Sequence, residues 1–371
     1  MSQPPGAARN LQDVKPYGRI CVVGGGAWGT ALAAVGVRAG RNVSQWSRDA
    51  ATATEIALNQ VNSRYLPDID LPPGIEATPD LESAIAGAEA ILIITPSTSI
   101  REVTHAVAAH SAADVPIFAG AKGIEAESGL LMTGIMAEEA PGRVLGAISG
   151  PTFAVETAQD LPTAVTVACS TRGMAASRMA ATLTTYSFRP YVSDDLVGVE
   201  IGGAVKNVIA IACGMVKGAG LGENLRAALI TRGLSEIKEL AVLLGGSRET
   251  VTGLSGMGDL MLTCSSEKSR NFSYGLQRGA GVAEGDVFEG RPVVVEGRDN
   301  AMTVTDLARA RGLHMPICEM VRAIVAEGAP IGDAFATYWS APIEAEPRAL
   351  DVAIAHPAQD AARDYFGDTN R

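Results

Sequence analysis

A chain of 371 residues is long enough for two domains, each with a hydrophobic core of its own. Its 30 basic and 41 acidic residues give a formal net charge of −11, and no basic face of the kind that binds a nucleic-acid duplex is present in the sequence. Hydrophobic residues make up 47% and charged residues 19%, which excludes wholesale disorder.

The chain opens with residues 1–18, which lack the apolar run of a secretory signal and are expected to form a flexible tail. The next stretch, Ile20 to Val37, has 18 residues without a charge, which is long enough for a membrane-spanning helix. Three consecutive glycines, Gly24 to Gly26, would weaken such a helix near its centre. A strand, a glycine turn and a helix account for the whole stretch, so no membrane insertion is expected.

The first half of the chain alternates short apolar runs with Ala-rich helical patterns, which is the sign of βαβ units around a parallel sheet. Several runs are apolar at consecutive positions, as in strands that are covered on both faces. We therefore predict an α/β fold with an N-terminal, Rossmann-type doubly wound sheet. The predicted strands are 19–24, 42–47, 90–95, 115–120, 144–149 and 163–168.

From residue 194 to about residue 341 the apolar spacing becomes helical, which predicts an all-helical C-terminal domain. The boundary is placed in the segment 187–195. The predicted organisation is a tail (1–18), a dinucleotide-binding domain (19–190), a helical substrate domain (191–350) and a C-terminal extension (351–371).

Gly24, Gly26 and Gly29 form a GxGxxG motif directly after the first predicted strand and before a helix. The first glycine allows a tight turn, the second lets the backbone approach a pyrophosphate, and the third permits close helix packing. The phosphates would then face the helix N-terminus. The motif indicates dinucleotide binding, and the alternative is a tight turn in some other α/β protein.

The turn after the second predicted strand reads Trp46, Ser47, Arg48, Asp49. NAD-specific folds place an acidic residue here, whereas NADP users place an Arg that pairs with the 2′-phosphate. Asp49 comes one position late and is expected to cap the next helix. Arg48 therefore indicates use of NADPH or of both cofactors, unless it is one solvated surface charge.

Lys206 lies in an apolar helical segment whose nearest other charges are Glu200 and Lys217. A buried ammonium loses hydration, so its pKa falls and it becomes a usable acid or base near neutral pH. Asn207 lies beside it, and the small residues 202–204 leave room for a ligand. We favour this functional interpretation over a lysine that extends along the surface to reach water.

Three polar, glycine-marked loops complete the candidate site. Lys122 follows a predicted strand, at the carboxyl end of the sheet where such folds bind ligands. The segment 149–156 offers Thr152 and backbone N–H groups at a helix start. The segment 254–271 combines a carboxylate, hydroxyls, a guanidinium and an amide, which suits a small phosphorylated polyol. Its polar residues are Asp259, Thr263, Ser269, Arg270 and Asn271, and the alternative is a surface loop with a capped helix.

Histidine and cysteine chemistry has little support in this sequence. None of the four histidines lies beside a predicted strand end or glycine loop, and no pair has metal-ligand spacing. The five cysteines are scattered and never form a CxxC pair, so neither a zinc cluster nor a disulfide framework is expected. The expected compartment is a reducing one, the cytoplasm.

Six motifs in order resemble the bacterial NAD(P)-dependent glycerol-3-phosphate dehydrogenases. They are GGGAWGTALA, AKGIE, SGPTFAVE, EIGGAVKNVIAIACGM, GENLRAALITRG and GMGDLMLTCSSEKSRN, and the resemblance extends from about residue 19 to about residue 345. It implies reversible hydride transfer between NAD or NADP and a small substrate, dihydroxyacetone phosphate or sn-glycerol 3-phosphate, in phospholipid biosynthesis. It has no counterpart for the C-terminal extension, and we expect a homodimer.

The resemblance also implies roles for individual residues. Lys206 matches the general acid/base, Lys122 suits stabilisation of the developing oxyanion, and Asp259 would orient Lys206. Positions that match substrate contacts are Lys122, Gly150, Thr152, Lys206, Asp259, Ser269, Arg270 and Asn271. Positions that match cofactor contacts, beside the glycine motif, are Ala27, Trp28, Arg48, Lys122, Ala154, Arg270, Val295 and Glu296.

Two other interpretations remain open. A different dehydrogenase with a helical second domain, acting on a β-hydroxyacid or a sugar phosphate, would share most of these features, although Ser269, Arg270 and Asn271 favour phosphate over carboxylate. A dinucleotide-binding redox sensor is the other interpretation, but it needs no desolvated lysine.

Overall fold

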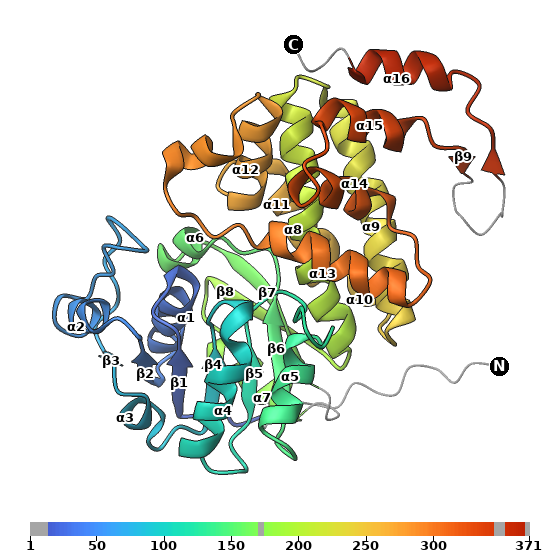
Figure 1. Ribbon diagram of the computed structural model, residues 1–371. Coiled ribbons are helices and arrows are strands. Elements are labelled where there is room, and N and C mark those ends of the chain that lie inside the picture. The colour runs from blue at the N-terminus through green and yellow to red at the C-terminus, as the bar shows by residue number, and fades with distance from the viewer. Residues whose placement is uncertain (1–13, 170–173, 345–352, 368–371) are drawn as a thin grey trace, which may run out of the picture. The chain divides into compact units, whose positions relative to one another are not determined.

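The computed structural model describes residues 14–169, 174–344 and 353–367 (Figure 1). Residues 1–13 of the predicted tail, and all but 353–367 of the predicted C-terminal extension, lie outside the described residues. The chain forms two compact units that interleave along the sequence. The first holds Met1–Ala121, Met136–Ile148 and Phe153–Leu196, and the second holds Lys122–Ile135, Ser149–Thr152 and Val197–Arg371.

The first unit is built on an eight-stranded, mostly parallel sheet with the strand order β3-β2-β1-β4-β5-β6-β7-β8. The central strands are buried along almost their whole length, as expected for strands that helices cover on both faces. The doubly wound fold predicted from the sequence is confirmed. The strands are β1 (Arg19–Val23), β2 (Asn42–Trp46), β3 (Ile75–Thr78), β4 (Ala90–Ile93), β5 (Ile117–Ala119), β6 (Leu145–Ser149), β7 (Thr163–Cys169) and β8 (Phe188–Ser193).

The helices of this region follow the strands in chain order. The uncharged stretch from Ile20 to Val37 forms β1, the glycine turn and most of α1, as predicted. The predicted strand list omitted β3 and also β8, which pairs in parallel with β7 within the segment that the sequence indicated as a boundary. The helices are α1 (Ala27–Arg38), α2 (Ala50–Asn59), α3 (Leu81–Ile85), α4 (Ile100–His110), α5 (Met132–Glu139), α6 (Ala154–Ala158) and α7 (Met174–Leu183), with a 3₁₀ turn at Ser97–Ser99.

The second unit is predominantly helical and surrounds one central helix, α8 (Leu196–Gly218). This helix is long and apolar enough to span a membrane, but 89% of its apolar window is buried in the structure, as in the core helix of a folded domain. The other helices are α9 (Glu223–Leu243), α10 (Arg248–Val251), α11 (Asp259–Ser265), α12 (Arg270–Gly279), α13 (Glu296–Ala310), α14 (Pro316–Val325), α15 (Ile331–Trp339) and α16 (Gln359–Gly367), with a π-helical turn at Leu254–Gly258 and a 3₁₀ segment at Glu284–Gly290.

Glycines bring α8 and α12 into backbone contact. A Cβ at Gly214 would lie 2.1 Å from the Phe272 carbonyl oxygen, and a Cβ at Gly275 would lie 2.1 Å from that of Ile211. Side chains larger than hydrogen at these positions would push the helices apart. The close approach fixes the start of α12, which carries three of the predicted substrate residues, against α8, which carries Lys206.

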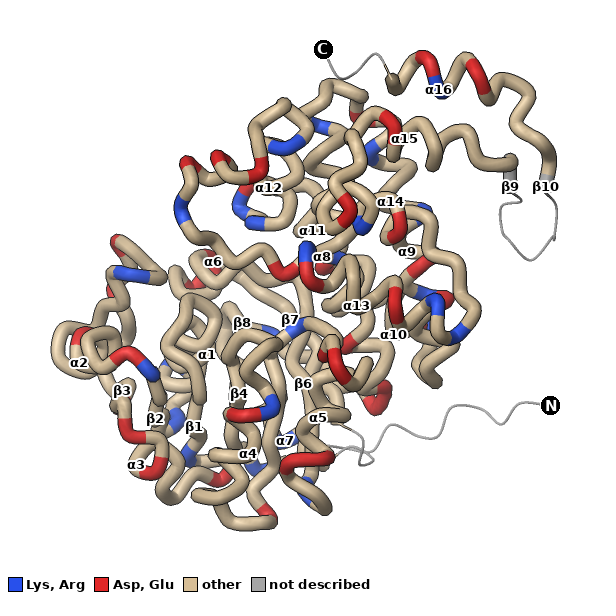
Figure 2. Tube along the Cα trace, viewed as in Figure 1, with Lys and Arg blue, Asp and Glu red and all other residues tan. Residues whose placement is uncertain are grey.

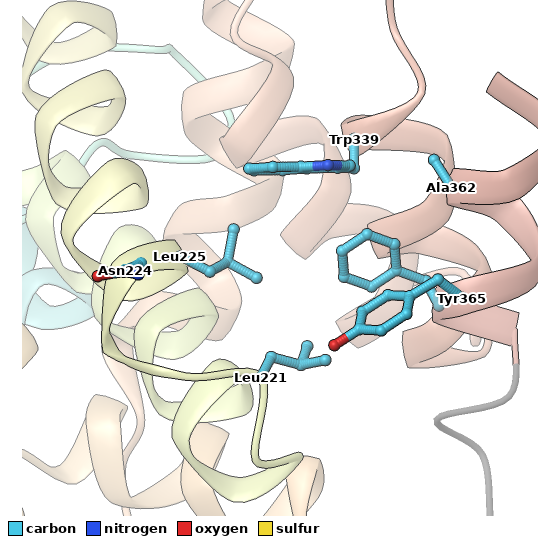
Figure 3. A pocket seen from close by; sticks show the side chains of 7 residues that line it. Leu221, Asn224, Leu225, Trp339, Ala362 and Tyr365 are labelled. Carbon is cyan, nitrogen blue, oxygen red and sulfur yellow. The ribbon is translucent and has the colours of Figure 1, made fainter. Parts of the chain in front are cut away.

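After α15 the structure has a short antiparallel pair of strands, β9 (Ile343–Glu344) and β10 (Ala353–Ile354), which the prediction of an all-helical C-terminal domain did not include. Helix α16 follows and packs on α15 through Phe366, whose ring centroid lies 6.3 Å from that of Phe335 and 6.1 Å from that of Trp339. Figure 3 shows Leu225, Trp339 and Tyr365 around a small cavity of about 330 Å³ beside α16.

Candidate functional site

The glycine motif has the geometry that dinucleotide binding requires. Gly24 has φ +144°, and a Cβ there would lie 2.3 Å from the carbonyl oxygen of Ile94. A Cβ at Gly29 would lie 2.1 Å from the carbonyl oxygen of Gly24. Gly26 differs, because no described atom lies within 4 Å of its Cβ position. Gly24 therefore allows the tight turn, Gly29 allows close packing of the helix, and Gly26 leaves its backbone open to a ligand.

Helix α1 begins beside this open position. Its N-cap is Gly26, and no side chain among the described residues caps its first N–H groups. Uncapped N–H groups at a helix N-terminus, together with the positive end of the helix dipole, suit a pyrophosphate. The half-buried side chains of Ala27 and Trp28 follow in the first turn. The residues present fit the phosphates of a dinucleotide.

Two buried side-chain amides, those of Gln45 and Asn62, hold the glycine turn, and neither residue is among the predicted site residues. The Gln45 side-chain amide donates to the Gly24 carbonyl at 2.9 Å, and that of Asn62 donates to the Gly25 carbonyl at 2.9 Å. Both also bond to the Thr30 hydroxyl, at 3.0 and 2.8 Å. Gln45 could have attracted notice as a long polar residue within a buried strand, whereas Asn62 lies in an irregular segment with no such signal.

The turn after β2 separates the roles of Arg48 and Asp49. Asp49 is the N-cap of α2, as predicted, and accepts from the Ala51 N–H and the Thr52 hydroxyl, each at 3.0 Å. It also pairs with Arg64 at 2.9 Å, and the hydrogen bond from Thr52 is the main reason that its pKa is lowered. Arg48 is exposed and forms no hydrogen bond or ion pair with a described residue. The free cation of this turn is therefore Arg48.

Ala154, another predicted cofactor residue, is the first residue of α6, which packs against α1 in the first unit. Arg38 of α1 donates to the carbonyl oxygens of Thr157 and Ala158 at 3.2 and 2.6 Å. The start of α6 is thereby tied to the same helix that begins at the glycine turn.

In the second unit, two lysines share one buried carboxylate. Asp259 is 1% exposed; its Oδ1 accepts from Lys206 Nζ at 2.5 Å and its Oδ2 from Lys122 Nζ at 2.6 Å. Lys206 also donates to the Thr263 hydroxyl at 2.8 Å. The structure thus brings together the three residues that the sequence indicated as catalytic, although they are up to 137 positions apart in the chain.

The charges in this cluster perturb one another. Burial lowers the pKa of Lys206 to about 8, with Asp259 opposing the drop and Lys122 adding to it. For Asp259, burial acts to raise the pKa, but the two ammonium groups outweigh it and hold the pKa below its usual value. The cluster therefore keeps Lys206 close to its titration point at neutral pH while Asp259 remains ionised.

Local backbone geometry explains why these side chains meet. Asp259 begins α11 directly after the π-helical turn, and the Cβ position of Gly258 lies 3.5 Å from Pro151. Pro151 lies between Gly150 and Thr152, whose hydroxyl donates to the Gly150 carbonyl at 3.2 Å. Gly150 has φ +154°, which a side chain would disfavour. The predicted substrate residues 150–152 thus lie against the turn that leads into Asp259.

The start of α12 combines an exposed cation with two anchored polar side chains. Ser269 is its N-cap and accepts from the Phe272 N–H, while Asn271 accepts from the Gly297 N–H at 2.8 Å. Arg270 is exposed and pairs with no described residue. Ser269 and Asn271 therefore also support the backbone, and Arg270 alone is free to bind an anion.

Asn271 and Asn207 together fix the start of α13. Val295 is the N-cap of that helix, and Glu296, its first residue, accepts from the Asn207 amide at 3.2 Å. Asn300 on the same helix donates to the Ala204 carbonyl at 3.0 Å. The predicted cofactor residues Val295 and Glu296 are thereby tied to α8 next to Lys206, and Asn300 is a supporting residue that the sequence did not reveal.

The arrangement suits reduction of a carbonyl group. Two ammonium groups converge on Asp259, with Glu296 as a further carboxylate that acts on Lys206, and the ammonium groups can stabilise an oxyanion that develops on a substrate. Lys and Arg are interspersed with Asp and Glu along the trace (Figure 2), so this buried cluster stands out by burial and not by regional charge. Among the described residues, no group of three or more His, Cys, Asp or Glu side chains is placed to hold a metal ion.

Comparison with known proteins identifies the family. Family models described as NAD-dependent glycerol-3-phosphate dehydrogenase N-terminus and C-terminus match residues 19–175 and 195–336. A glycerol-3-phosphate dehydrogenase [NAD(P)+] of Maricaulis maris is 46% identical over 89% of this chain and 98% of its own length, and one from Parvibaculum lavamentivorans is also 46% identical. The crystal structure of glycerol-3-phosphate dehydrogenase from Coxiella burnetii matches with a TM-score of 0.81 at 38% identity, over 85% of this chain and 97% of that one.

Proposed function

The chain belongs to the NAD-dependent glycerol-3-phosphate dehydrogenase family, and we propose that it reversibly reduces dihydroxyacetone phosphate to sn-glycerol 3-phosphate. The observation that carries the proposal is the sharing of the buried Asp259 carboxylate by Lys206 and Lys122. The product is a precursor of glycerophospholipids, which gives the enzyme its place in lipid synthesis.

Reduction of the ketone adds a hydride to the carbonyl carbon and a proton to its oxygen. Bound reduced NAD(P) supplies the hydride. Lys206 donates the proton from its Nζ, since its pKa of about 8 leaves it protonated yet able to release that proton. The Lys122 ammonium, which donates to Asp259, stabilises the oxygen as negative charge develops. In the oxidative direction the neutral Lys206 amine takes the proton back.

Asp259 keeps both ammonium groups in place during these steps. It contacts each of them at 2.6 Å or less and is itself nearly inaccessible to water. A fixed carboxylate limits the rotamers of the two long side chains, so less reorganisation is needed when the substrate oxygen arrives.

Arg270, at the N-terminus of α12, is the residue we assign to the substrate phosphate. Its guanidinium can make two parallel hydrogen bonds to phosphate oxygens, and the helix N-terminus adds backbone N–H groups. Ser269 and Asn271 flank it, and Gly150 and Thr152 complete the substrate contacts that we propose.

The glycine turn is the part of the chain that we assign to the pyrophosphate of NAD or NADP. Gly24, Gly26 and Gly29 shape it, with Ala27 and Trp28 in the first turn of α1. Arg48 is assigned to the 2′-phosphate of NADP, because Asp49 is engaged with its own helix. The remaining cofactor contacts that we propose are Lys122, Ala154, Arg270, Val295 and Glu296.

The alternative functions fit less well. A redox sensor would need the glycine turn but no buried lysine at its titration point. A reductase for an unphosphorylated hydroxyacid would use Arg270 to bind the carboxylate of its substrate, but the relatives at 46% identity are named glycerol-3-phosphate dehydrogenases. A cytoplasmic homodimer remains our proposal for the working form of the enzyme, and sedimentation analysis of the purified protein tests its oligomeric state.

The test is product analysis with a labelled cofactor. The protein is incubated with dihydroxyacetone phosphate and NADPH carrying deuterium at the transferable position, and the product is examined by mass spectrometry and chiral assay. We expect sn-glycerol 3-phosphate with one deuterium at C2. Oxidation of NADPH without this product would refute the proposed reaction.

A further inference from the structure

Glu200 is a buried carboxylate for which the proposed chemistry has no use. It lies on α8, is 7% exposed, and directs both oxygens at one residue. Its Oε1 accepts from the Thr133 N–H at 2.9 Å and its Oε2 accepts from the Thr133 hydroxyl at 2.5 Å. A further hydrogen bond comes from the Met132 N–H. Glu200 therefore caps the first turn of α5.

The chain segment that ends at this cap is the one that begins at Lys122. Ile124 and Leu131 pair as an antiparallel bridge, and the Glu125 N–H donates to the Leu130 carbonyl at 2.9 Å. The segment 122–133 is thus a closed loop, with Lys122 at its start and Thr133 at its end. Holding Thr133 in place restricts the position of Lys122.

Helix α8, which carries Glu200, also contacts the Lys122 side chain directly. A Cβ on Gly203 would lie 3.1 Å from Lys122 Cγ and 3.2 Å from its Cδ, so the lysine stem lies against α8 at a residue without a side chain. Residues three apart on a helix lie on one face, so Glu200 and Gly203 face the same loop. Helix α8 therefore contacts the loop at both of its ends.

Burying the ionised carboxylate of Glu200 costs free energy of folding. Burial raises the pKa of Glu200 to about 7, although the hydrogen bonds from Thr133 and Met132 oppose the rise. No described Lys or Arg pairs with Glu200, and a buried charge without a cationic partner is a poor source of stability. What the carboxylate offers is two acceptors in fixed positions, which orient a backbone N–H and a hydroxyl at once.

We propose that Glu200 is a positioning residue for Lys122, acting through Thr133 and the loop 122–133 to hold the Lys122 ammonium where the substrate oxygen needs it. The inference rests on the proposed function, because it presumes that Lys122 acts on the reacting oxygen. Glu200 itself does not touch the substrate.

The first experiment compares Glu200→Gln with a matched control, Glu236→Gln. Glu236 is also buried, at 1% exposed, and caps α14 through the N–H groups of Ile317 and Cys318, at 2.7 and 3.3 Å. We expect Glu200→Gln to lower kcat for dihydroxyacetone phosphate by about tenfold to a hundredfold, since small misplacements of a catalytic group have effects of this size. Its affinity for NADPH falls by less than about threefold, because Lys122 is one of many proposed cofactor contacts, and Glu236→Gln keeps kcat within about twofold of wild type. Wild-type kcat in Glu200→Gln overturns the inference.

The second experiment repeats Glu200→Gln in a Lys122→Met background, measured as a single-turnover rate. If Glu200 acts through Lys122, removing it there lowers the rate by less than about twofold, because interacting residues are not additive. Equal losses in both backgrounds would show a general structural role and overturn the inference. If Glu200→Gln does not fold, Thr133→Val replaces it in both experiments, with an expected loss in kcat of about threefold to tenfold. A wild-type protein without activity on dihydroxyacetone phosphate would refute the proposed function instead.

Discussion

The chemistry of single residues here depends on one carboxylate that serves two cations. Asp259 contacts both Lys206 and Lys122, and burial lowers the pKa of Lys206 to about 8 in spite of the contact with Asp259. A lone buried lysine would lose its proton more readily, and a lysine with a carboxylate of its own would hold it more firmly. A lysine that shares its carboxylate with a second lysine holds its proton with intermediate strength. This suits a reaction in which the lysine donates a proton in one direction and accepts it in the other.

This sharing predicts opposite pH profiles for the two directions. Ketone reduction uses protonated Lys206, so its kcat/KM should fall as pH rises through about 8, the pKa of the lysine. Alcohol oxidation uses the neutral amine, so its kcat/KM should rise over the same range. Initial rates between pH 6 and 10, in steps of about half a unit, check this, and parallel profiles in the two directions would contradict it.

Arg270 provides a second prediction at this scale. Arg270→Ala should raise KM for dihydroxyacetone phosphate by roughly tenfold, because it removes a charge-assisted contact that is partly solvated. Unphosphorylated dihydroxyacetone is the matched control substrate, and the substitution should leave its slow reduction unchanged. An equal loss for both substrates would show that Arg270 does not bind the phosphate.

We expect the turn between β2 and α2 to bind the adenosine end of the cofactor. Asp49 is held by its helix and by Arg64, which leaves Arg48 to meet a 2′-phosphate. Arg48→Ala should therefore weaken NADPH binding by about tenfold and leave NADH binding unchanged, as measured by fluorescence titration. Equal binding of both cofactors before and after the substitution would show that Arg48 is only a surface charge.

Helix α16 packs on α15 through a cluster of aromatic side chains. Phe366 is nearly buried and contacts Phe335 and Trp339, whereas its neighbour Tyr365 is 65% exposed. Phe366→Ala should release the helix, and amide hydrogen exchange in residues 359–367 should accelerate by about a hundredfold or more. Tyr365→Ala should have a much smaller effect. Unchanged protection in Phe366→Ala would mean that other contacts hold α16.

Element prediction from the sequence succeeded where strands are buried and failed at the edges of the sheet. Most of the six predicted strands are apolar because helices cover them, and β2 is buried although it contains Ser44 and Gln45. The edge strand β8 contains Pro190 and exposes Arg189 and Tyr191, so its sequence is typical of a turn. A proline is tolerated there because one side of an edge strand needs no hydrogen bond. The other omission, β3, is an edge strand of four residues.

For the candidate site, sequence patterns single out residues with unusual surroundings but not the residues that support them. Lys206 stands out because it lies alone in an apolar helix, and Glu200 has the same kind of surroundings six positions earlier. Gln45, Asn62 and Asn300 could not be found in this way, because each acts through hydrogen bonds to backbone that lies far away in sequence. Local patterns contain no information on such pairings.

Across the whole molecule, the segments that carry the site are not continuous in sequence. Lys122–Ile135 and Ser149–Thr152 belong to the helical unit, although each follows or ends a strand of the sheet. Loops at the carboxyl ends of parallel strands are where such folds bind ligands. Lys122, Lys206 and Asp259 thereby come to lie in one compact unit.

The central claim is that Lys206 transfers the proton, and kcat of Lys206→Ala on dihydroxyacetone phosphate tests it most directly. The matched control is Lys217→Ala on the same helix, where the lysine is exposed and pairs with Glu267. The account predicts a loss in kcat of roughly 10² to 10⁴ for Lys206→Ala, with NADPH affinity nearly unchanged and wild-type kcat in Lys217→Ala. A folded Lys206→Ala protein with wild-type kcat would contradict the account.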